Sequence, residues 1–156
     1  MKHLGKCFEA GTLVRMYDDS LKPIEELNIG DIVYTYNPRG RQFLTISVQD
    51  VIAQKVRRMV QVKFDTGLVV KCTPEHQFAC KCGAWKRADQ LEWSRIAVMG
   101  EHDPPLVVEV LNLAPELITV YDLLIPTHHT FVITEKNIVV HDFTVSAVEF
   151  LNKPTA

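Results

Sequence analysis

The chain has 156 residues, of which 47% are hydrophobic and 23% are charged, a balance typical of an ordinary globular core. Its formal net charge of -2 argues against nucleic acid or an anionic membrane as the main partner. No apolar run approaches the roughly 18 residues of a membrane span, and residues 1–6 lack the apolar core of a signal peptide. We therefore expect one soluble, monomeric domain that belongs to a larger cytoplasmic host protein.

Short runs rich in branched residues follow one another along the chain, and turn signals such as those at residues 37–40 and 65–67 separate them. Helix is expected only in short pieces, the best of them at residues 23–27. A last strand-like stretch ends at His141 and Asp142. The pattern predicts an all-β fold with strands at residues 12–16, 31–36, 61–64, 68–72, 107–110 and 119–123.

A weak internal repeat relates two segments of the chain. Residues 24–33 align without a gap with residues 88–97, and each has a short acidic turn, a leucine, a spacer, a turn and a strand. The repeat predicts two related halves that bring distant segments to one central cleft. Chance recurrence of this pattern in a β-rich domain is the alternative.

Five motifs follow one another in order along the chain. The first begins at Cys7 and continues to a leucine-x-x-glycine-aspartate turn, and the second is the Thr-x-x-His run of Thr73 and His76. The others lie at residues 85–91, at 121–131 and at 139–142. Together they resemble the motifs of the hedgehog/intein (Hint) superfamily. The resemblance implies a horseshoe-like Hint fold of two pseudo-symmetric halves over residues 7–142, with both junctions at one central site. Residues 1–6 and 143–156 would then be flanking segments.

At the amino-terminal junction, the resemblance implies that the thiol of Cys7 attacks the carbonyl of Lys6 and turns the amide into a thioester. An ordinary thiol is only a few per cent thiolate at neutral pH, so the site must deprotonate it or activate the amide. The family pattern assigns His76 to protonate the departing Cys7 nitrogen and Thr73 to orient the scissile peptide.

The resemblance also implies roles for Asp122 and for His129, which follows it by seven residues. Asp122 would act on the thiol and couple the two cleavage sites, and His129 would assist at the carboxyl-terminal junction. His128 is adjacent, and because side chains alternate along a strand only one of the two histidines can face the site. We choose His129 for its distance from Asp122, and we expect residues 134–137 to extend a hairpin beyond it.

The carboxyl-terminal junction departs from the family pattern, in which a terminal asparagine amide attacks its own carbonyl with help from the preceding histidine, here His141. Asp142 can cyclise only to a strained, reversible anhydride, and Phe143 has no hydroxyl or thiol to accept the acyl group. We therefore expect slow or blocked cleavage between Asp142 and Phe143 and no ligation of the flanks. A natural aspartate and an engineered replacement of asparagine would give the same sequence.

This combination is similar in character to bacterial intein-like and toxin-associated Hint domains. Residues 100–105, where a homing endonuclease would be inserted, form only a short loop, which indicates a mini form. Such a domain would act once on its own flanking segments, with an external thiol or water as the acyl acceptor. It would need no cofactor.

Two other functions stay open. Cys72, His76, Cys80 and Cys82 form a Cys-x3-His-x3-Cys-x-Cys run that could be a structural zinc site, although Cys80-x-Cys82 is tighter than a common zinc knuckle. Without a secretion signal, we expect the cysteines to be reduced thiols rather than disulfides. The chain could also be an inert β interaction domain derived from an intein, which would show no thiol-induced cleavage.

Overall fold

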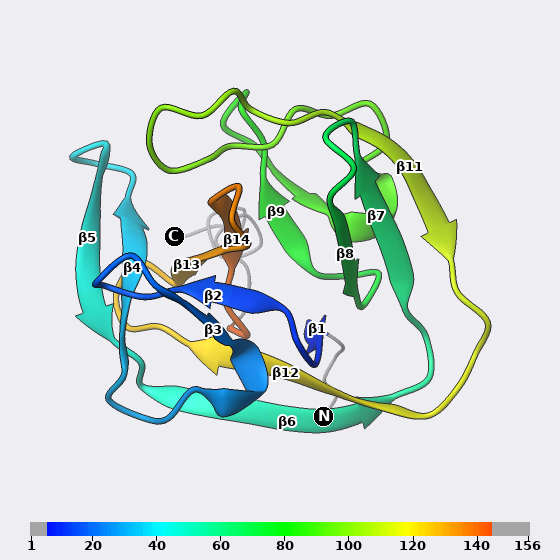
Figure 1. Cartoon of the computed structure of the whole chain (residues 1–156), viewed down its shortest axis with the longest axis horizontal. Helices are drawn as coiled ribbons and strands as arrows, with labels where there is room; N and C mark the ends of the chain where they lie inside the picture. The colour runs from blue at the N-terminus through cyan, green and yellow to red at the C-terminus, as the bar shows by residue number, and fades with distance from the viewer. Residues whose placement is uncertain (1–5, 145–156) are drawn as a thin grey trace, which may run out of the picture.

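The computed structural model describes residues 6–144, and its regular structure there consists of strands and two 3-10 turns. All strand pairs are antiparallel, and the strands form two six-stranded sheets and a separate hairpin, arranged around the centre of the molecule (Figure 1). Nothing helical within residues 6–144 has the length and apolar character needed to span a membrane. The predicted all-β fold is confirmed.

The first sheet carries the amino terminus of the described chain, and the second carries its carboxyl terminus. The first has the order β11 (Val107–Asn112), β7 (Val60–Phe64), β8 (Val69–Cys72), β1 (Phe8–Glu9), β12 (Ile118–Leu124) and β6 (Asp50–Val56). The second has the order β10 (Trp85–Arg87), β9 (Gln77–Ala79), β14 (Ile138–His141), β13 (Thr130–Ile133), β2 (Leu13–Arg15) and β3 (Leu21–Pro23). The hairpin pairs β4 (Ile32–Asn37) with β5 (Gln42–Ser47), and the 3-10 turns are η1 (Ile24–Glu26) and η2 (Ala88–Gln90).

The six strands predicted from branched runs correspond to β2, β4, β7, β8, β11 and β12, and the predicted short helix is η1. Strands β5 and β6 were not predicted, because they mix polar and apolar residues and are half exposed. Strands β1, β3, β9 and β10 are two or three residues long, which is too short for a periodic pattern to reveal.

The internal repeat is visible in the backbone hydrogen bonds. The Met16 N–H donates to the Ser20 carbonyl over 2.8 Å, and the Cys80 N–H donates to the Ala84 carbonyl over 2.9 Å. The second hydrogen bond lies as many residues after the first as segment 88–97 lies after segment 24–33. Strands β2 and β3 with η1 are therefore repeated as β9 and β10 with η2.

The hairpin of β13 and β14 lies between the two repeats. Strand β13 pairs with β2 through Ile133 and Val14, and strand β14 pairs with β9 through Val140 and Phe78, which is the repeat equivalent of Val14. The predicted hairpin connection at residues 134–137 joins the two central strands. Two related halves thus enclose one central hairpin, as the repeat predicted.

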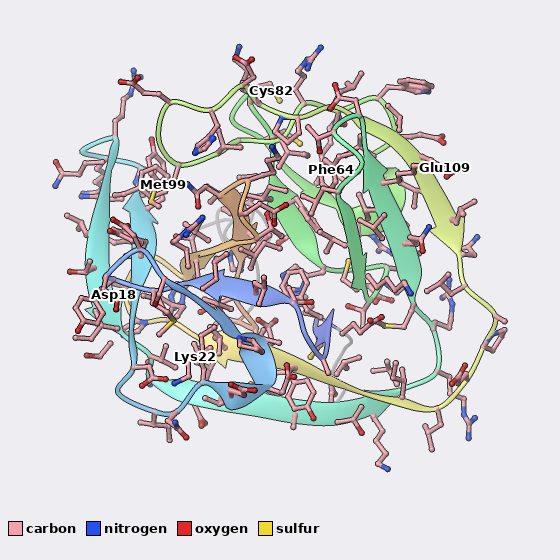
Figure 2. The ribbon with its side chains drawn as sticks, viewed as in Figure 1. Asp18, Lys22, Phe64, Cys82, Met99 and Glu109 are labelled. Carbon is pink, nitrogen blue, oxygen red and sulfur yellow. The ribbon has the colours of Figure 1, made fainter. Side chains whose placement is uncertain are left out.

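The core fills the space between the two sheets. Every residue of β13 and β14 is buried, so these strands are covered on both faces. The ring of Phe8 meets the rings of Phe78 and Phe131 edge to face, with centroids 6.2 and 6.1 Å apart. Polar side chains such as those of Asp18 and Glu109 lie at the rim (Figure 2). The aromatic contacts join β1, β9 and β13, the three elements that lead into the central site.

Replacement of Phe131 should show how much of the stability depends on this core. Phe131→Ala removes a fully buried ring and leaves a cavity, so we expect the free energy of unfolding to fall by about 3–5 kcal/mol. Urea unfolding followed by tryptophan fluorescence measures this. The matched control is Leu117→Ala at a side chain that is 52% exposed, which should change stability by less than about 0.5 kcal/mol. Equal losses in the two variants would contradict the position of the core.

Candidate active site at the two junctions

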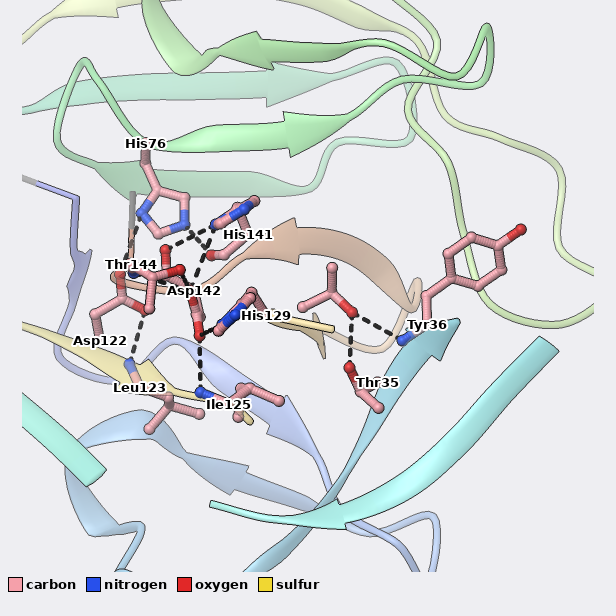
Figure 3. A network of polar contacts seen from close by, with 11 residues as sticks. Thr35, Tyr36, His76, Asp122, Leu123, Ile125, His129, His141, Asp142 and Thr144 are labelled. Carbon is pink, nitrogen blue, oxygen red and sulfur yellow. Dashed lines mark hydrogen bonds and ion pairs between the residues drawn. The ribbon is translucent and has the colours of Figure 1, made fainter. Parts of the chain in front are cut away.

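Residues that are far apart in the sequence meet beside the central hairpin (Figure 3). Cys7 directly precedes β1, which pairs with both β8 and β12. The pairing brings the turn that follows β8 and the middle of β12 to the amino-terminal junction. The carboxyl-terminal junction follows β14 in the second sheet. The predicted site residues Cys7, Thr73, His76, Asp122, His129, His141 and Asp142 form one connected network of contacts.

Thr73 holds the backbone of Cys7 on both sides. The Cys7 N–H donates to Thr73 Oγ1 over 3.0 Å, and the Thr73 N–H donates to the Cys7 carbonyl over 2.9 Å. Both residues are buried, so little solvent competes for these groups. The nitrogen that would leave from Lys6 is therefore held in a fixed orientation.

The thiol of Cys7 is buried and protonated at rest. Burial raises the pKa of the thiol far above its ordinary value, and the negative charge that Asp122 can carry adds to the effect. The Gln54 amide opposes both, because its Nε2–H donates to the Cys7 sulfur over 3.2 Å. The surroundings of the sulfur therefore disfavour a thiolate, and the Gln54 amide is a hydrogen-bond donor that favours it.

His76 connects the two ends of the domain. Its Nε2 lies 2.8 Å from the carbonyl oxygen of His141, and because a carbonyl only accepts, Nε2 carries the proton and Nδ1 the lone pair. Burial lowers the pKa of His76 to about 3, although hydrogen bonds to the backbone of His141 and of Lys6 oppose this shift. The imidazole is therefore neutral near neutral pH. The ring of Phe8 packs against it with centroids 4.1 Å apart.

Asp122 faces the lone pair of His76. Its Oδ2 lies 3.7 Å from His76 Nδ1, and its Oδ1 accepts the N–H of Leu123 over 2.8 Å. Burial raises the pKa of Asp122 well above its usual range, the Leu123 N–H opposes this, and Asp142 adds to it. Asp122 and His76 are thus an acid and a neutral base rather than an ion pair. Within residues 6–144, neither His76 Nδ1 nor Asp122 Oδ2 has a hydrogen-bond partner, although both are buried. Such atoms call for a functional explanation.

Asp142, unlike Asp122, has a lowered pKa and is ionised. Its Oδ2 accepts the N–H of Ile125 over 2.7 Å and lies 3.2 Å from His129 Nδ1. Its Oδ1 accepts the N–H of Thr144 over 2.9 Å and the hydroxyl of Thr144 over 2.5 Å. Although burial opposes it, hydrogen bonds from His141, Thr144 and Ile125 hold the pKa of Asp142 below its usual range. The side chain is a buried carboxylate with donors on both oxygens.

Two histidines flank the peptide bond after Asp142. His141 Nδ1 lies 3.1 Å from the Asp142 carbonyl oxygen, and the His129 ring stacks on the His141 ring with centroids 6.4 Å apart. His129 adopts a left-handed backbone with φ of 54°, and it is His129 rather than His128 that contacts Asp142. His128 instead lines a separate hollow beside Trp85.

The zinc-binding alternative is not supported. Within the described part of the chain, no group of three or more His, Cys, Asp or Glu side chains could hold a metal ion. Cys72 is buried and Cys82 is exposed at the rim, beyond the end of β9 (Figure 2). His76 is directed to His141 and Asp122. Close spacing in the sequence does not bring these four side chains to one point.

Some contacts of the site involve residues to which the sequence analysis gave no role. They include the Gln54 amide on the Cys7 sulfur, the N–H of Leu123 on Asp122, and the donors of Ile125 and Thr144 on Asp142. The Ile125 contact uses the backbone, so its residue type carries no signal. Gln54 could have been noticed only as a polar residue between apolar ones on β6.

Known proteins are similar to this chain in sequence pattern and fold. The model of the Hint module family matches residues 1–98. The chain resembles a bacterial intein-like domain from Clostridium thermocellum with 23% identity and a TM-score of 0.79, over 87% of this chain and 98% of that one. It resembles a DnaB intein from Synechocystis sp. with 22% identity and a TM-score of 0.77, over 89% and 99% of the two chains. Among curated protein sequences no match was found. The coverage confirms the expected mini form without an inserted endonuclease.

The depressed pKa of His76 predicts how stability depends on pH. The pKa is about 3 in the fold against 6.5 for a free histidine, so below pH 6.5 the unfolded chain takes up a proton that the folded chain does not. When the pH falls from about 7 to about 5, the free energy of unfolding of the wild type should decrease by about 2 kcal/mol more than that of His76→Gln. The raised pKa of Asp122 has the opposite effect and increases the free energy of unfolding as the pH falls. Because Asp122 is present in both proteins, its effect cancels in the comparison.

Urea unfolding of the wild type and of His76→Gln at the two pH values gives this difference. His102→Gln, at an exposed histidine, is the matched control and should follow the wild type. If the free energies of unfolding of the wild type and of His76→Gln differ by the same amount at both pH values, His76 is not a neutral, buried side chain.

Proposed function

The chain belongs to the Hint module family, and on that premise we propose that residues 7–142 cleave the polypeptide in which they lie. They would act once, on the peptide bonds that join them to the flanks at residues 1–6 and 143–156. The observation that carries the proposal is one short motif in contact with both junctions. Thr73 accepts the N–H of Cys7, and His76 binds the carbonyl of His141.

The first step is an acyl shift from nitrogen to sulfur. Cys7 Sγ attacks the carbonyl carbon of Lys6, the new C–S bond forms, and the bond to the Cys7 nitrogen breaks. The proton on Asp122 passes to His76 Nδ1, which faces it, and from there to the departing nitrogen. The Asp122 carboxylate so formed takes the proton of the thiol, so that no net proton is gained or lost.

The charge states of Asp122 and His76 support this relay. A protonated carboxyl beside a neutral imidazole holds the proton that the leaving nitrogen needs. Because 3.7 Å separates Asp122 Oδ2 from His76 Nδ1, the proton stays on Asp122 until the reaction begins. Thr73 keeps the nitrogen in place while it changes from amide to amine. The thioester would then pass to an external thiol or to water.

Ligation of the two flanks has no acceptor in this arrangement. Phe143 has no nucleophilic side chain, and the Thr144 hydroxyl is bound to Asp142 Oδ1. Ser146, which also has a hydroxyl, lies outside the described residues. We therefore expect cleavage at the amino-terminal junction without splicing by the standard route.

The carboxyl-terminal step should be slow for two reasons. The Asp142 carboxylate would have to leave several donors to attack its own carbonyl, and the product is a reactive anhydride. The Phe143 N–H also donates to the Leu123 carbonyl over 3.0 Å, which holds the nitrogen that would leave. His141 Nδ1, 3.1 Å from the Asp142 carbonyl oxygen, would polarise that carbonyl, and His129, which contacts the Asp142 carboxylate, would assist at this junction.

Thiol treatment tests the first step. A precursor incubated with dithiothreitol or hydroxylamine should release the segment that ends at Lys6, because either reagent captures the thioester. Cys7→Ala removes the nucleophile and His76→Ala removes the relay, so both should abolish the release. Mass spectrometry of the fragments over time measures it.

The matched control is Cys82→Ala, which removes an exposed cysteine and should leave the rate unchanged. A precursor that stays intact after long exposure to thiol would overturn the thioester mechanism. It would favour the inert interaction domain instead.

Asp142→Asn tests the second junction. The asparagine amide can cyclise to a succinimide, and in the resting geometry its NH2 group would face the N–H of either Ile125 or Thr144. We expect faster cleavage before Phe143, together with a loss of about 1–3 kcal/mol in the free energy of unfolding from the mismatched donors. Mass spectrometry for the fragment that begins at Phe143, in a Cys7→Ala background, follows the cleavage.

Asp103→Asn, at an exposed aspartate, is the control for the loss of charge and should match the parent in both measurements. Absence of the Phe143 fragment from Asp142→Asn would mean that His129 and His141 do not act at this bond. Unchanged stability would mean that the donors around residue 142 do not select a carboxylate.

A further inference from the structure

Gln54 is a polar residue that lies between the apolar side chains of Ile52 and Val56 on one face of its strand. Along β6, Ala53 and Lys55 are exposed, whereas Ile52, Gln54 and Val56 are half buried. Alternation along a strand places these last three on one face. A glutamine on the inner face needs a partner for its amide, because burying an amide without a hydrogen bond is costly.

The partner is the nucleophile itself. Gln54 Nε2 lies 3.2 Å from Cys7 Sγ and can only donate, so the sulfur accepts. The register of β6 fixes this position, since Gln54 lies directly opposite Val120 of β12. Val120 packs against Cys7 in a small apolar cluster that also contains Met59. The amide thus reaches the sulfur from a paired strand of the sheet, beside this apolar cluster.

We propose that Gln54 is a further catalytic residue, whose amide N–H stabilises the thiolate of Cys7 as the acyl shift begins. The inference rests on the proposed function. When the thiol proton leaves, the negative charge on sulfur strengthens the N–H···S bond, and when the C–S bond to Lys6 forms, the charge moves away from sulfur to the carbonyl oxygen. Gln54 gives up no proton and forms no covalent bond.

An uncharged donor suits this position. A lysine or arginine beside the sulfur would be a buried cation whenever the thiol is protonated, which is the resting state. An amide provides a donor without that cost. It also cannot take the thiol proton, so that task stays with Asp122.

The size of the effect follows from two opposing consequences of the hydrogen bond. A donor to a charged acceptor should raise the thiolate fraction about tenfold. The same stabilisation lowers the intrinsic reactivity of the thiolate, because nucleophilicity falls with pKa at a Brønsted slope of about 0.4–0.5. The net gain in rate is therefore about threefold.

The experiment compares precursors that carry Gln54→Met and Gln54→Glu with the unaltered precursor. Methionine keeps the length of the side chain and removes the donor, and glutamate keeps its shape and places a negative charge beside the sulfur. Two rates are measured by mass spectrometry, namely alkylation of Cys7 by iodoacetamide and dithiothreitol-induced release of the segment that ends at Lys6. Gln54→Met should lower both about threefold, and Gln54→Glu should lower both further.

Alkylation separates a chemical role from a structural one. Cys7 is fully buried, so a variant that merely loosens the packing would expose the thiol and speed alkylation, whereas loss of the donor slows it. Gln61→Met, at a half-buried glutamine on β7 of the same sheet, is the matched control and should leave both rates unchanged. Alkylation that is equal or faster in both Gln54 variants would overturn the inference.

Two further outcomes are decided by the same measurements. If Gln54→Met fails to fold, as judged by circular dichroism, the slowing in the isosteric Gln54→Glu carries the test. If no precursor ever releases the Lys6 fragment, the thioester mechanism fails, and the alkylation rates still decide for or against Gln54 as the donor that stabilises the thiolate.

Discussion

The hydrogen bond between His76 Nε2 and the His141 carbonyl is the contact on which the rest of the site depends. It joins the turn after β8 to the end of β14 and so connects the two junctions through one side chain. It also decides the tautomer of His76, because the proton must lie on the nitrogen that faces a carbonyl. The other nitrogen is thereby left as a base toward Asp122. One backbone acceptor therefore determines both the geometry of the site and the direction in which a proton can move.

Two buried carboxyl groups near this bond are held in opposite charge states by the number of donors around them. Asp122 receives one backbone N–H and keeps its proton. Asp142 receives donors on both oxygens and loses it. Burial raises the pKa of both groups, several hydrogen bonds lower that of Asp142, and the charge of Asp142 raises that of Asp122 further. The protonated Asp122 lies at the amino-terminal junction, where the leaving nitrogen needs a proton. The ionised Asp142 lies at the carboxyl-terminal junction, where we expect slow cleavage.

The repeat explains how these groups come to one place. Strands β2 and β9 occupy equivalent positions in the two halves, and the hairpin of β13 and β14 pairs with one half on each side. This central position buries the hairpin on both faces. It also places His141, at the end of β14, next to the turn that leads into β9.

The sequence by itself determined what depends on local pattern: six strands from branched runs, the last strand that ends at His141, the repeat, and the residue types at the ends of the domain, Cys7 and Asp142. Branched runs, turn residues and ordered motifs are properties of neighbours in the chain, so they can be read without coordinates. The choice of His129 over His128 was made from the sequence, and the structure shows its contact with Asp142. The tertiary structure alone decided that the four clustered cysteine and histidine ligands do not converge and that Gln54 reaches the Cys7 sulfur. Each of these depends on strand register and on backbone groups of remote segments, because packing between distant parts of the chain, and not residue type, sets which atoms lie within hydrogen-bond distance.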